Sequence, residues 1–309
     1  MSRYYAFVLA AACLALVGLN QPLDAAAEEE PIIVGSKIDT EGSLLGQMIL
    51  LVLEDEGLNV TDKTEFGPTP IVRKAINAGE IDIYPEYTGN GAIFFEDTDT
   101  PVWQNREQGY ERVKSLDYEE NNLVWLTPAP ADNSWALAVR RDFALGNGLR
   151  TLDDLAQFIE TGGEIKLAAC EEFVTREDAL PAFEQAYDFS LSEDKMVVFS
   201  GCNTAQTEKA AARGTSGVNT AMAFGTDGSL SALDLRVLED TKGVQPVYAP
   251  TPVVREDALE AHPQIEEILA PVFESLSQET LQELNSKIAV GGQNPGKVAK
   301  TYLQDNDFL

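Results

Sequence analysis

GEIDIYPEYTGNG, residues 79–91, has the pattern of a β-strand that ends in a turn. Ile81 and Ile83 alternate with polar residues, and Pro85 ends the alternation before a segment rich in Gly, Thr and Asn. In α/β proteins, strand ends that carry aromatic and small polar residues commonly form binding sites. The stretch therefore predicts a strand whose end places the Tyr87 ring in a cleft, although a buried strand with an ordinary turn has the same pattern.

Strand-like and helix-like segments alternate through the rest of the chain, which predicts an α/β fold. Further strands are expected at 32–36, 60–66, 123–126, 136–140, 165–169, 196–199 and 218–224, and helices at 40–56, 71–78, 107–116, 151–160, 179–187, 204–212, 264–276, 279–287 and 297–304.

Two proline-containing segments have the pattern of crossings between two lobes. They are PAPADN at 128–133 and VYAPTPVV at 247–254. We expect lobe I to comprise 28–133 plus 248–309, and lobe II to comprise 134–247. Two extended crossings between lobes make a hinge, with a cleft where the lobes meet.

The first 27 residues have the pattern of an export signal. Arg3 precedes an apolar run at 6–19, and the alanines at 25–27 form an A-x-A cleavage site before acidic residues. An uncleaved anchor is the alternative, and Cys13 lies too early in the run for a lipoprotein site. We therefore expect a signal peptide at 1–27 and a soluble exported protein.

The chain is strongly acidic, with 22 Lys and Arg against 51 Asp and Glu and a net charge of −29. Such a chain does not bind nucleic acid through a basic face and avoids anionic membrane surfaces. The acidity has two explanations: solubility, or export into a saline medium in which salt screens the self-repulsion.

Two cysteines remain in the expected mature chain, Cys170 and Cys202. Each follows a strand-like run, so their sulfurs meet at one sheet edge if those strands are parallel neighbours. An oxidising compartment then favours a disulfide. Two free buried thiols are the alternative.

The sequence offers little for catalysis. The single histidine, His262, precedes Pro263 at a helix start and is expected at the surface. Two cysteines and one histidine do not make a zinc cluster, and phosphate-loop and hydrolase motifs are absent. Carboxylates are too abundant for a pair of them to indicate a glycosidase. We therefore expect no enzyme activity, cofactor or metal.

The aromatic residues at strand ends and crossings offer more for binding. These are Tyr87, Trp135, Phe224 and Tyr248. A quaternary ammonium group cannot donate a conventional hydrogen bond, so aromatic faces hold it best, at about 0.5–2 kcal/mol each when desolvated. Each ring taken singly is equally consistent with the hydrophobic core.

A ligand carboxylate would need cationic side chains or helix N-terminal amides. Lys37 follows the first expected strand, and Arg176 follows the strand that ends at Cys170. Each of the two, taken alone, is equally an ordinary surface charge.

Several motifs, in order along the chain, resemble the osmoprotectant-binding proteins of ABC transporters, and the enterobacterial type most of all. They are GSK at 35–37 with Thr40 and Glu41, the 79–91 stretch, NSWALAV at 133–139, FGTDG at 224–228 and YAPTPVVR at 248–255. The resemblance implies a monomeric, two-lobed periplasmic binding protein fold of the class II type. It also implies delivery of glycine betaine, choline or carnitine to an inner-membrane permease.

Carried over by position, the resemblance assigns nine contact residues. Tyr87, Trp135, Phe224 and Tyr248 would line an ammonium cage, Lys37 and Arg176 would face a carboxylate, and Thr69, Asn90 and Asn133 would supply polar contacts. This chain departs from the family at four positions: Trp135 and Phe224 replace common tyrosines, Asn90 a threonine and Gly42 a glutamine. The ligand choice is therefore open among betaines, choline and carnitine. The same fold is also compatible with an amino acid or a polyamine as ligand, and a similar scaffold is compatible with an enzyme.

Overall fold

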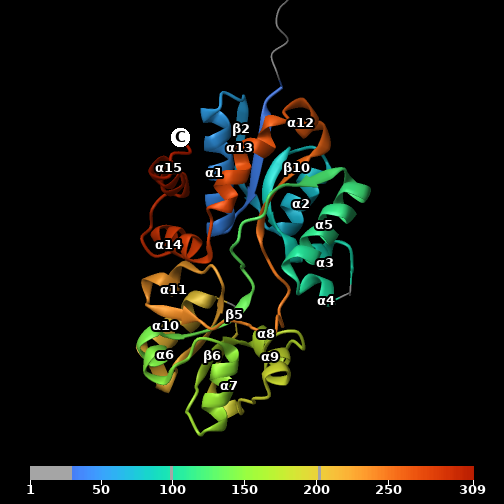
Figure 1. The fold of residues 1–309 in the computed structure, drawn as a ribbon. Coiled ribbons are helices and arrows are strands. Elements are labelled where there is room, and N and C mark those ends of the chain that lie inside the picture. Colours follow the sequence, from blue (N-terminus) through green and yellow to red (C-terminus); the bar gives the residue numbers. More distant parts are fainter. Residues whose placement is uncertain (1–29, 98–99, 201–202) are drawn as a thin grey trace, which may run out of the picture. The chain divides into compact units, whose positions relative to one another are not determined.

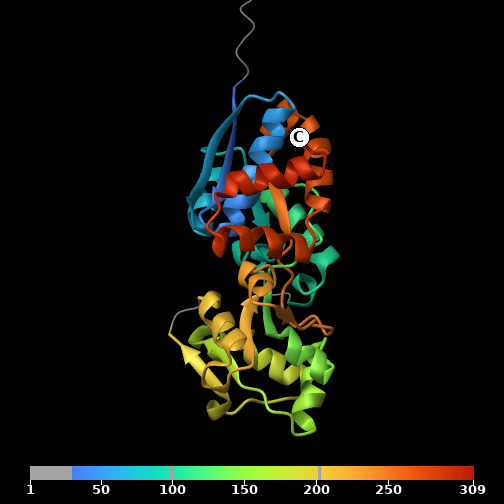
Figure 2. The same cartoon turned by 90° about the vertical axis from the view of Figure 1, so that its left-hand side faces the viewer.

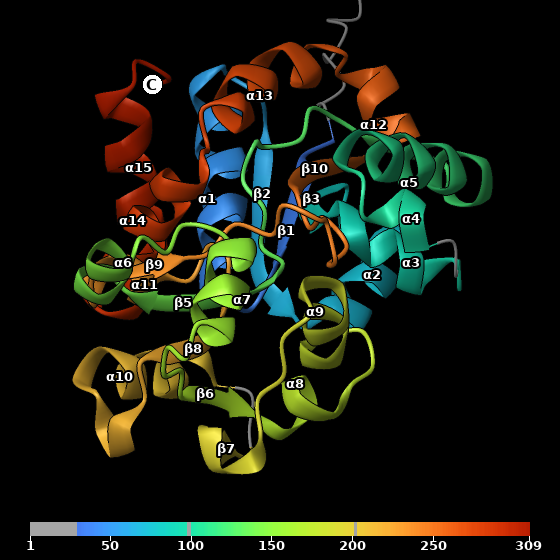
Figure 3. The same ribbon diagram turned by 60° about the horizontal axis from the view of Figure 1, so that its bottom comes forward.

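Two five-stranded sheets, one in each lobe, organise the unit Pro31–Leu309 (Figure 1). The computed structural model describes residues 30–97, 100–200 and 203–309. The signal peptide expected at 1–27 thus lies outside the described residues. Figures 2 and 3 show the two groups of elements from two further directions.

The first sheet has the strand order β2-β1-β3-β10-β4, with β1–β3 parallel and β10 antiparallel to both its neighbours. Its strands are β1 (Ile32–Lys37), β2 (Val60–Gly67), β3 (Ile83–Tyr87), β4 (Leu123–Trp125) and β10 (Pro250–Arg255). The accompanying helices are α1 (Thr40–Asp55), α2 (Thr69–Asn77), α3 (Gly91–Phe94), α4 (Thr100–Trp103), α5 (Arg106–Asn121), α12 (Glu256–Ala261), α13 (Gln264–Glu274), α14 (Gln278–Ala289) and α15 (Pro295–Asp305), with the 3₁₀ turn η1 (Thr88–Asn90).

The second sheet has the order β7-β6-β8-β5-β9, with β6 parallel to β7 and β8, and β5 antiparallel to β8 and β9. Its strands are β5 (Trp135–Arg140), β6 (Leu167–Cys170), β7 (Met196–Phe199), β8 (Thr220–Phe224) and β9 (Leu235–Val237). The accompanying helices are α6 (Arg141–Asn147), α7 (Leu152–Glu160), α8 (Glu171–Thr175), α9 (Leu180–Tyr187), α10 (Thr204–Arg213) and α11 (Gly228–Ala232), with the 3₁₀ turns η2 (Glu193–Lys195) and η3 (Thr215–Gly217).

The crossing expected at 247–254 is wrong in its second half, because β10 is an inner strand of the first sheet. Prolines usually argue against an inner strand. Here Pro252 lies opposite Pro85 of β3, so two residues that lack an N–H face each other. The carbonyls of Pro250 and Pro252 accept hydrogen bonds from the amides of Ala129 and Leu126, at 2.8 and 3.0 Å.

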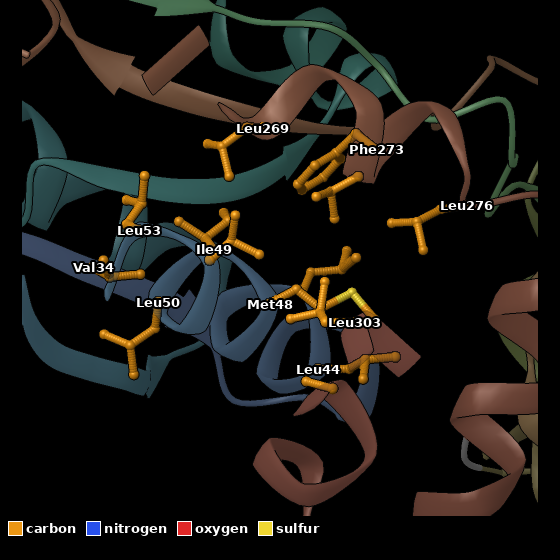
Figure 4. Packing of buried hydrophobic residues seen from close by; sticks show 14 of the residues in the cluster. Val34, Leu44, Met48, Ile49, Leu50, Leu53, Leu269, Phe273, Leu276 and Leu303 are labelled. Carbon is orange, nitrogen blue, oxygen red and sulfur yellow. The ribbon is translucent and has the colours of Figure 1, made fainter. Parts of the chain in front are cut away.

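The core of the first lobe forms where α1 packs between the sheet and the C-terminal helices. Leu44, Met48 and Ile49 of α1 are fully buried at helical spacing, and they meet Phe273 of α13 and Leu303 of α15 (Figure 4). This core combines a helix from the N-terminal part of the chain with helices from the C-terminal part, which explains why residues 250–305 belong to the first lobe.

His262 is buried, at 7 % exposed, so its expected surface position is wrong. It lies between α12 and α13, and its backbone N–H and carbonyl bond to Ala258 and Ile265.

The condition set for a disulfide is met, because β6 and β7 are parallel neighbours and Cys170 pairs in register with Phe199. Cys170 is buried and disulfide-bonded. Cys202 lies outside the described residues, so its pairing with Cys170 stays a prediction. Among the described helices we find none whose length and hydropathy would allow it to cross a membrane.

Candidate functional site

A cavity of about 540 Å³ is lined by residues of both lobes. It gathers residues from the ends of β1 and β3 in the first lobe, from β5 and β8 in the second, and from the segments that connect the lobes. Eight of the nine predicted contact residues line it: Lys37, Thr69, Tyr87, Asn133, Trp135, Arg176, Phe224 and Tyr248.

Asn90 is the exception, because it does not line the cavity. Its side-chain amide donates to Glu86 Oε1 at 2.7 Å, beneath the turn that follows β3. Asn90 therefore supports the wall of the cavity, and its predicted direct contact with a ligand finds no support in this geometry.

Two rings of the predicted cage meet in the second lobe because of strand register. Trp135 of β5 pairs with Phe224 of β8, and their rings stack with centroids 6.1 Å apart at 27°. The ring of Phe173 packs at right angles to that of Trp135, with centroids 5.6 Å apart and an interplanar angle of 88°. This antiparallel pairing brings residues 89 positions apart into one wall of the cavity.

In the first lobe, Tyr87 ends β3, and its hydroxyl donates to Glu41 Oε1 at 2.8 Å. Glu41 Oε2 accepts from Asn285 Nδ2 at 2.6 Å, and the same amide donates to the carbonyl of Thr226 at 2.9 Å. Burial raises the pKa of Glu41 to about 7, although these hydrogen bonds oppose the shift. Glu41 thus holds the Tyr87 ring in place, and hydrogen bonds through Asn285 connect it to the turn after β8. The sequence motif that contains Thr40 and Glu41 pointed to this position, but it predicted no role for Glu41.

Tyr248, on the return crossing, packs against a glycine of the turn after β3. A Cβ on Gly89 would lie 3.0 Å from three atoms of the Tyr248 ring. A side chain at position 89 would therefore displace this ring by a few tenths of an ångström.

Gly89→Ala should weaken ligand binding about threefold to tenfold, or about 1 kcal/mol, by this displacement. The binding of glycine betaine to wild type and to Gly89→Ala is to be measured by titration calorimetry. Gly146→Ala is the matched control, because no atom lies within 4 Å of a Cβ at this position in α6. Equal affinities of Gly89→Ala and wild type would show that Tyr248 does not contact the ligand.

Both predicted anion-binding cations are already paired with carboxylates. Lys37 forms a buried ion pair with Glu86, and its Nζ lies 4.5 Å from the Tyr87 ring centroid. Arg176 pairs with Glu172 at 2.8 Å and Asp178 at 2.6 Å, and its guanidinium carbon lies 4.5 Å from the Trp135 ring centroid. Each cation therefore covers one face of a cage ring in this conformation, where a ligand ammonium would compete with it.

The fold and the cavity define a class: a two-lobed α/β binding protein of the periplasmic type, with its ligand cavity at the crossings between the lobes. Within this class, the model of the substrate binding domain of ABC-type glycine betaine transport systems matches residues 30–305, so the chain belongs to that family. The resemblance inferred from the motifs is thereby confirmed.

Relatives of known name agree with the family. The glycine betaine-binding protein YehZ of Escherichia coli K12 is 55% identical over 293 residues, which cover 95% of each chain. A glycine-betaine-binding protein of Pseudomonas aeruginosa is 31% identical over 96% of this chain and 94% of its own. The solved structure of apo YehZ from E. coli superposes with a TM-score of 0.87 at 56% identity, and covers 91% of this chain and 100% of that one. The chain is therefore a solute-binding component of an ABC transport system, and proteins of this kind bind small solutes and work with a membrane permease.

Proposed function

We propose that this chain binds glycine betaine, or a closely related quaternary-ammonium osmoprotectant, in the cavity between its lobes and presents it to an inner-membrane permease. The observation that carries the proposal is the meeting of four aromatic residues from distant segments, Tyr87, Trp135, Phe224 and Tyr248, in one cavity. Ring faces from both lobes suit a methylated ammonium, because it offers charge and apolar surface but no N–H donor. The names of the E. coli and P. aeruginosa relatives point to the same ligand.

In this proposal the protein works as a periplasmic monomer without catalytic chemistry. The signal at 1–27 directs export, and the hinge divides lobe I (28–133 plus 248–309) from lobe II (134–247). The assignment of the strands to the two sheets supports these lobe boundaries, because β4 and β10 lie in the first sheet and β5 lies in the second. Closure of the lobes would exclude water and form the surface that the permease recognises.

The polar end of the ligand needs partners that the cage does not supply. Lys37 and Arg176 would serve a ligand carboxylate if it replaced Glu86, Glu172 or Asp178 as their partner. Thr69 and Asn133 offer neutral contacts in the same cavity.

The test is titration calorimetry and thermal unfolding of the purified protein with glycine betaine, choline, carnitine and proline. Glycine betaine at 100 times its Kd should stabilise the fold by about 2.7 kcal/mol, which raises Tm by roughly 5 °C in a chain of this size. Proline lacks the methylated ammonium and should have a much smaller effect. The absence of binding by every quaternary amine would refute the proposal.

A further inference from the structure

Helix α14 belongs to the core of the first lobe, and it also lies beside α11 of the second lobe (Figure 1). Leu281 and Leu284 of α14 are buried in the core of the first lobe. Gln282 and Asn285, three residues apart, share another face of the same helix. This polar face meets the turn that follows β8 of the second lobe.

Two side chains of α14 donate hydrogen bonds to the backbone of that turn. The amide of Gln282 donates to the carbonyl of Gly225 at 2.6 Å, and the amide of Asn285 donates to the carbonyl of Thr226 at 2.9 Å. Gly225 and Thr226 directly follow Phe224, one of the rings of the predicted cage. Helix α14 therefore holds a cage segment of the second lobe against the first lobe.

The close approach of this turn to α14 explains a glycine of the motif FGTDG at 224–228. A Cβ on Gly228 would lie 2.4 Å from the carbonyl carbon of Asn285 and 2.4 Å from the backbone nitrogen of Ser286. Only a residue without a Cβ lets two backbone segments come this close. The start of α11 thus lies directly against the backbone of α14.

Asn285 also connects the turn to the cage ring of the first lobe. Its amide nitrogen donates to Glu41 Oε2 at 2.6 Å, and Glu41 Oε1 accepts from the Tyr87 hydroxyl at 2.8 Å. The side chains of Glu41 and Asn285 line the cavity, and both residues are only 5 % exposed. Three hydrogen bonds in succession therefore lead from the Tyr87 ring to the turn that follows Phe224.

We propose that Asn285 and Glu41 are positioning residues for ligand binding, because they hold the Tyr87 ring of the first lobe and the Phe224 turn of the second lobe at a fixed separation before the ligand arrives. The inference rests on the proposed function, since it assumes that both rings receive the ammonium. When the connection is broken, the arrangement that binds the ligand is populated for a smaller part of the time. The affinity then falls in proportion to that population.

The loss should be the same for every ligand that carries a methylated ammonium. In the proposed function, Tyr87 and Phe224 face the end that glycine betaine and choline share, whereas Lys37 and Arg176 face the end in which the two ligands differ. A change that acts through the two rings therefore lowers both affinities by the same factor. This equality distinguishes positioning from a direct contact with the ligand carboxylate or hydroxyl.

The test is titration calorimetry of the purified protein with glycine betaine and with choline at pH 8.5. Burial raises the pKa of Glu41 to about 7, so at this pH its carboxylate is ionised and accepts from both donors. Asn285→Ala should weaken the binding of both ligands by about tenfold, which corresponds to a binding arrangement populated about a tenth of the time.

A double-mutant cycle shows whether Asn285 acts through the Tyr87 ring. Tyr87→Phe keeps the ring and removes only the hydroxyl that binds Glu41, so it should also weaken both ligands. The double variant should lose less than the product of the two single losses, because both changes break the same series of hydrogen bonds. Two independent structural defects would instead multiply.

Asn219→Ala is the matched control. The Asn219 amide also donates to a carbonyl of a distant segment, that of Glu164 at 2.8 Å, but the contact lies within the second lobe and does not line the cavity. This variant should keep the wild-type affinity. Gly228→Ala tests the same contact from the second lobe, because its Cβ pushes the turn away from α14 without removing a hydrogen-bonding group. It should weaken both ligands and serves as the test if Asn285→Ala fails to fold.

Hydrogen exchange of the ligand-free protein gives a measurement that is independent of any ligand. The backbone amides at 225–230 should exchange faster in Asn285→Ala than in wild type, because the turn loses a hydrogen bond to α14. The amides of α7, in the same lobe, should exchange at the wild-type rate.

The outcomes distinguish the positioning role from the proposed function. Unchanged affinities in both Asn285→Ala and Gly228→Ala, losses that multiply in the double variant, or a loss confined to one ligand would overturn the positioning role and leave the proposed function intact. The absence of binding by both ligands to wild type would overturn the proposed function itself. Unchanged exchange at 225–230 in Asn285→Ala would overturn the positioning role even then.

Discussion

Asp117→Asn should destabilise the protein by about 3–5 kcal/mol, because it leaves a buried guanidinium without its countercharge. Asp117 is 0 % exposed in α5, and it binds both terminal nitrogens of Arg73 from α2, at 2.8 and 2.5 Å. Its Oδ2 also accepts from the indole of Trp125 in β4 at 2.7 Å. One carboxylate therefore joins two helices and a strand of the first lobe.

The measurement is urea unfolding, monitored by circular dichroism. The free energies of unfolding of wild type and variant are compared, provided that both proteins unfold with the same m value. Asp234→Asn is the matched control, because its partner Arg141 lies 2.6 Å away in an ion pair with both side chains more than half exposed. The control should change stability by less than about 1 kcal/mol. A loss below about 1 kcal/mol for Asp117→Asn would show that water replaces the carboxylate around Arg73.

Local patterns were sufficient to predict most of the fold. Alternating apolar residues located the strands, and apolar residues at helical spacing located the helices. In the structure Asp39 and Thr151 cap α1 and α7, since their side chains accept from backbone amides. The pattern failed at Pro252, because a proline inside a strand argues against an inner strand unless the partner strand also lacks an N–H at that place, whereas Pro250 is the first residue of β10, where a proline is tolerated. Only the register with Pro85 reveals this exception.

The candidate site was partly predictable for a similar reason. The rings of the predicted cage lie at strand ends and at a crossing, which can be recognised in the sequence, and the family motifs assigned all of them to one site. The pairing of Lys37 with Glu86, 49 residues later, and of Arg176 with its two carboxylates depends on three-dimensional contacts. Glu208 also lines the cavity, and it offered one local signal, since it is the only acidic residue in the alanine-rich helix α10 and lies on its buried side. Without the fold, however, its place in the cavity wall could not be inferred.

Trp135→Ala should have the largest effect on ligand binding, a loss of about 2–3 kcal/mol or roughly 30- to 150-fold in Kd. The cation–π contact accounts for up to about 2 kcal/mol of this loss, and the contact between the indole and the ligand methyl groups accounts for the rest. Trp135 is also held by two neighbouring rings, since Phe224 stacks on it and Phe173 packs at right angles to it. Its position in the cavity is therefore set before the ligand arrives.

Trp135→Phe keeps an aromatic face and should lose less than about tenfold. Phe143→Ala is the matched control: Phe143 packs edge-on against Phe158 in the same lobe, does not line the cavity, and should affect stability more than affinity. Arg176 also lies over Trp135, but Glu172 and Asp178 hold its guanidinium independently of the ring. Glycine betaine and choline should therefore both lose affinity in Trp135→Ala, because both carry the methylated ammonium. Unchanged affinity for both ligands in Trp135→Ala would place the ammonium elsewhere in the cavity.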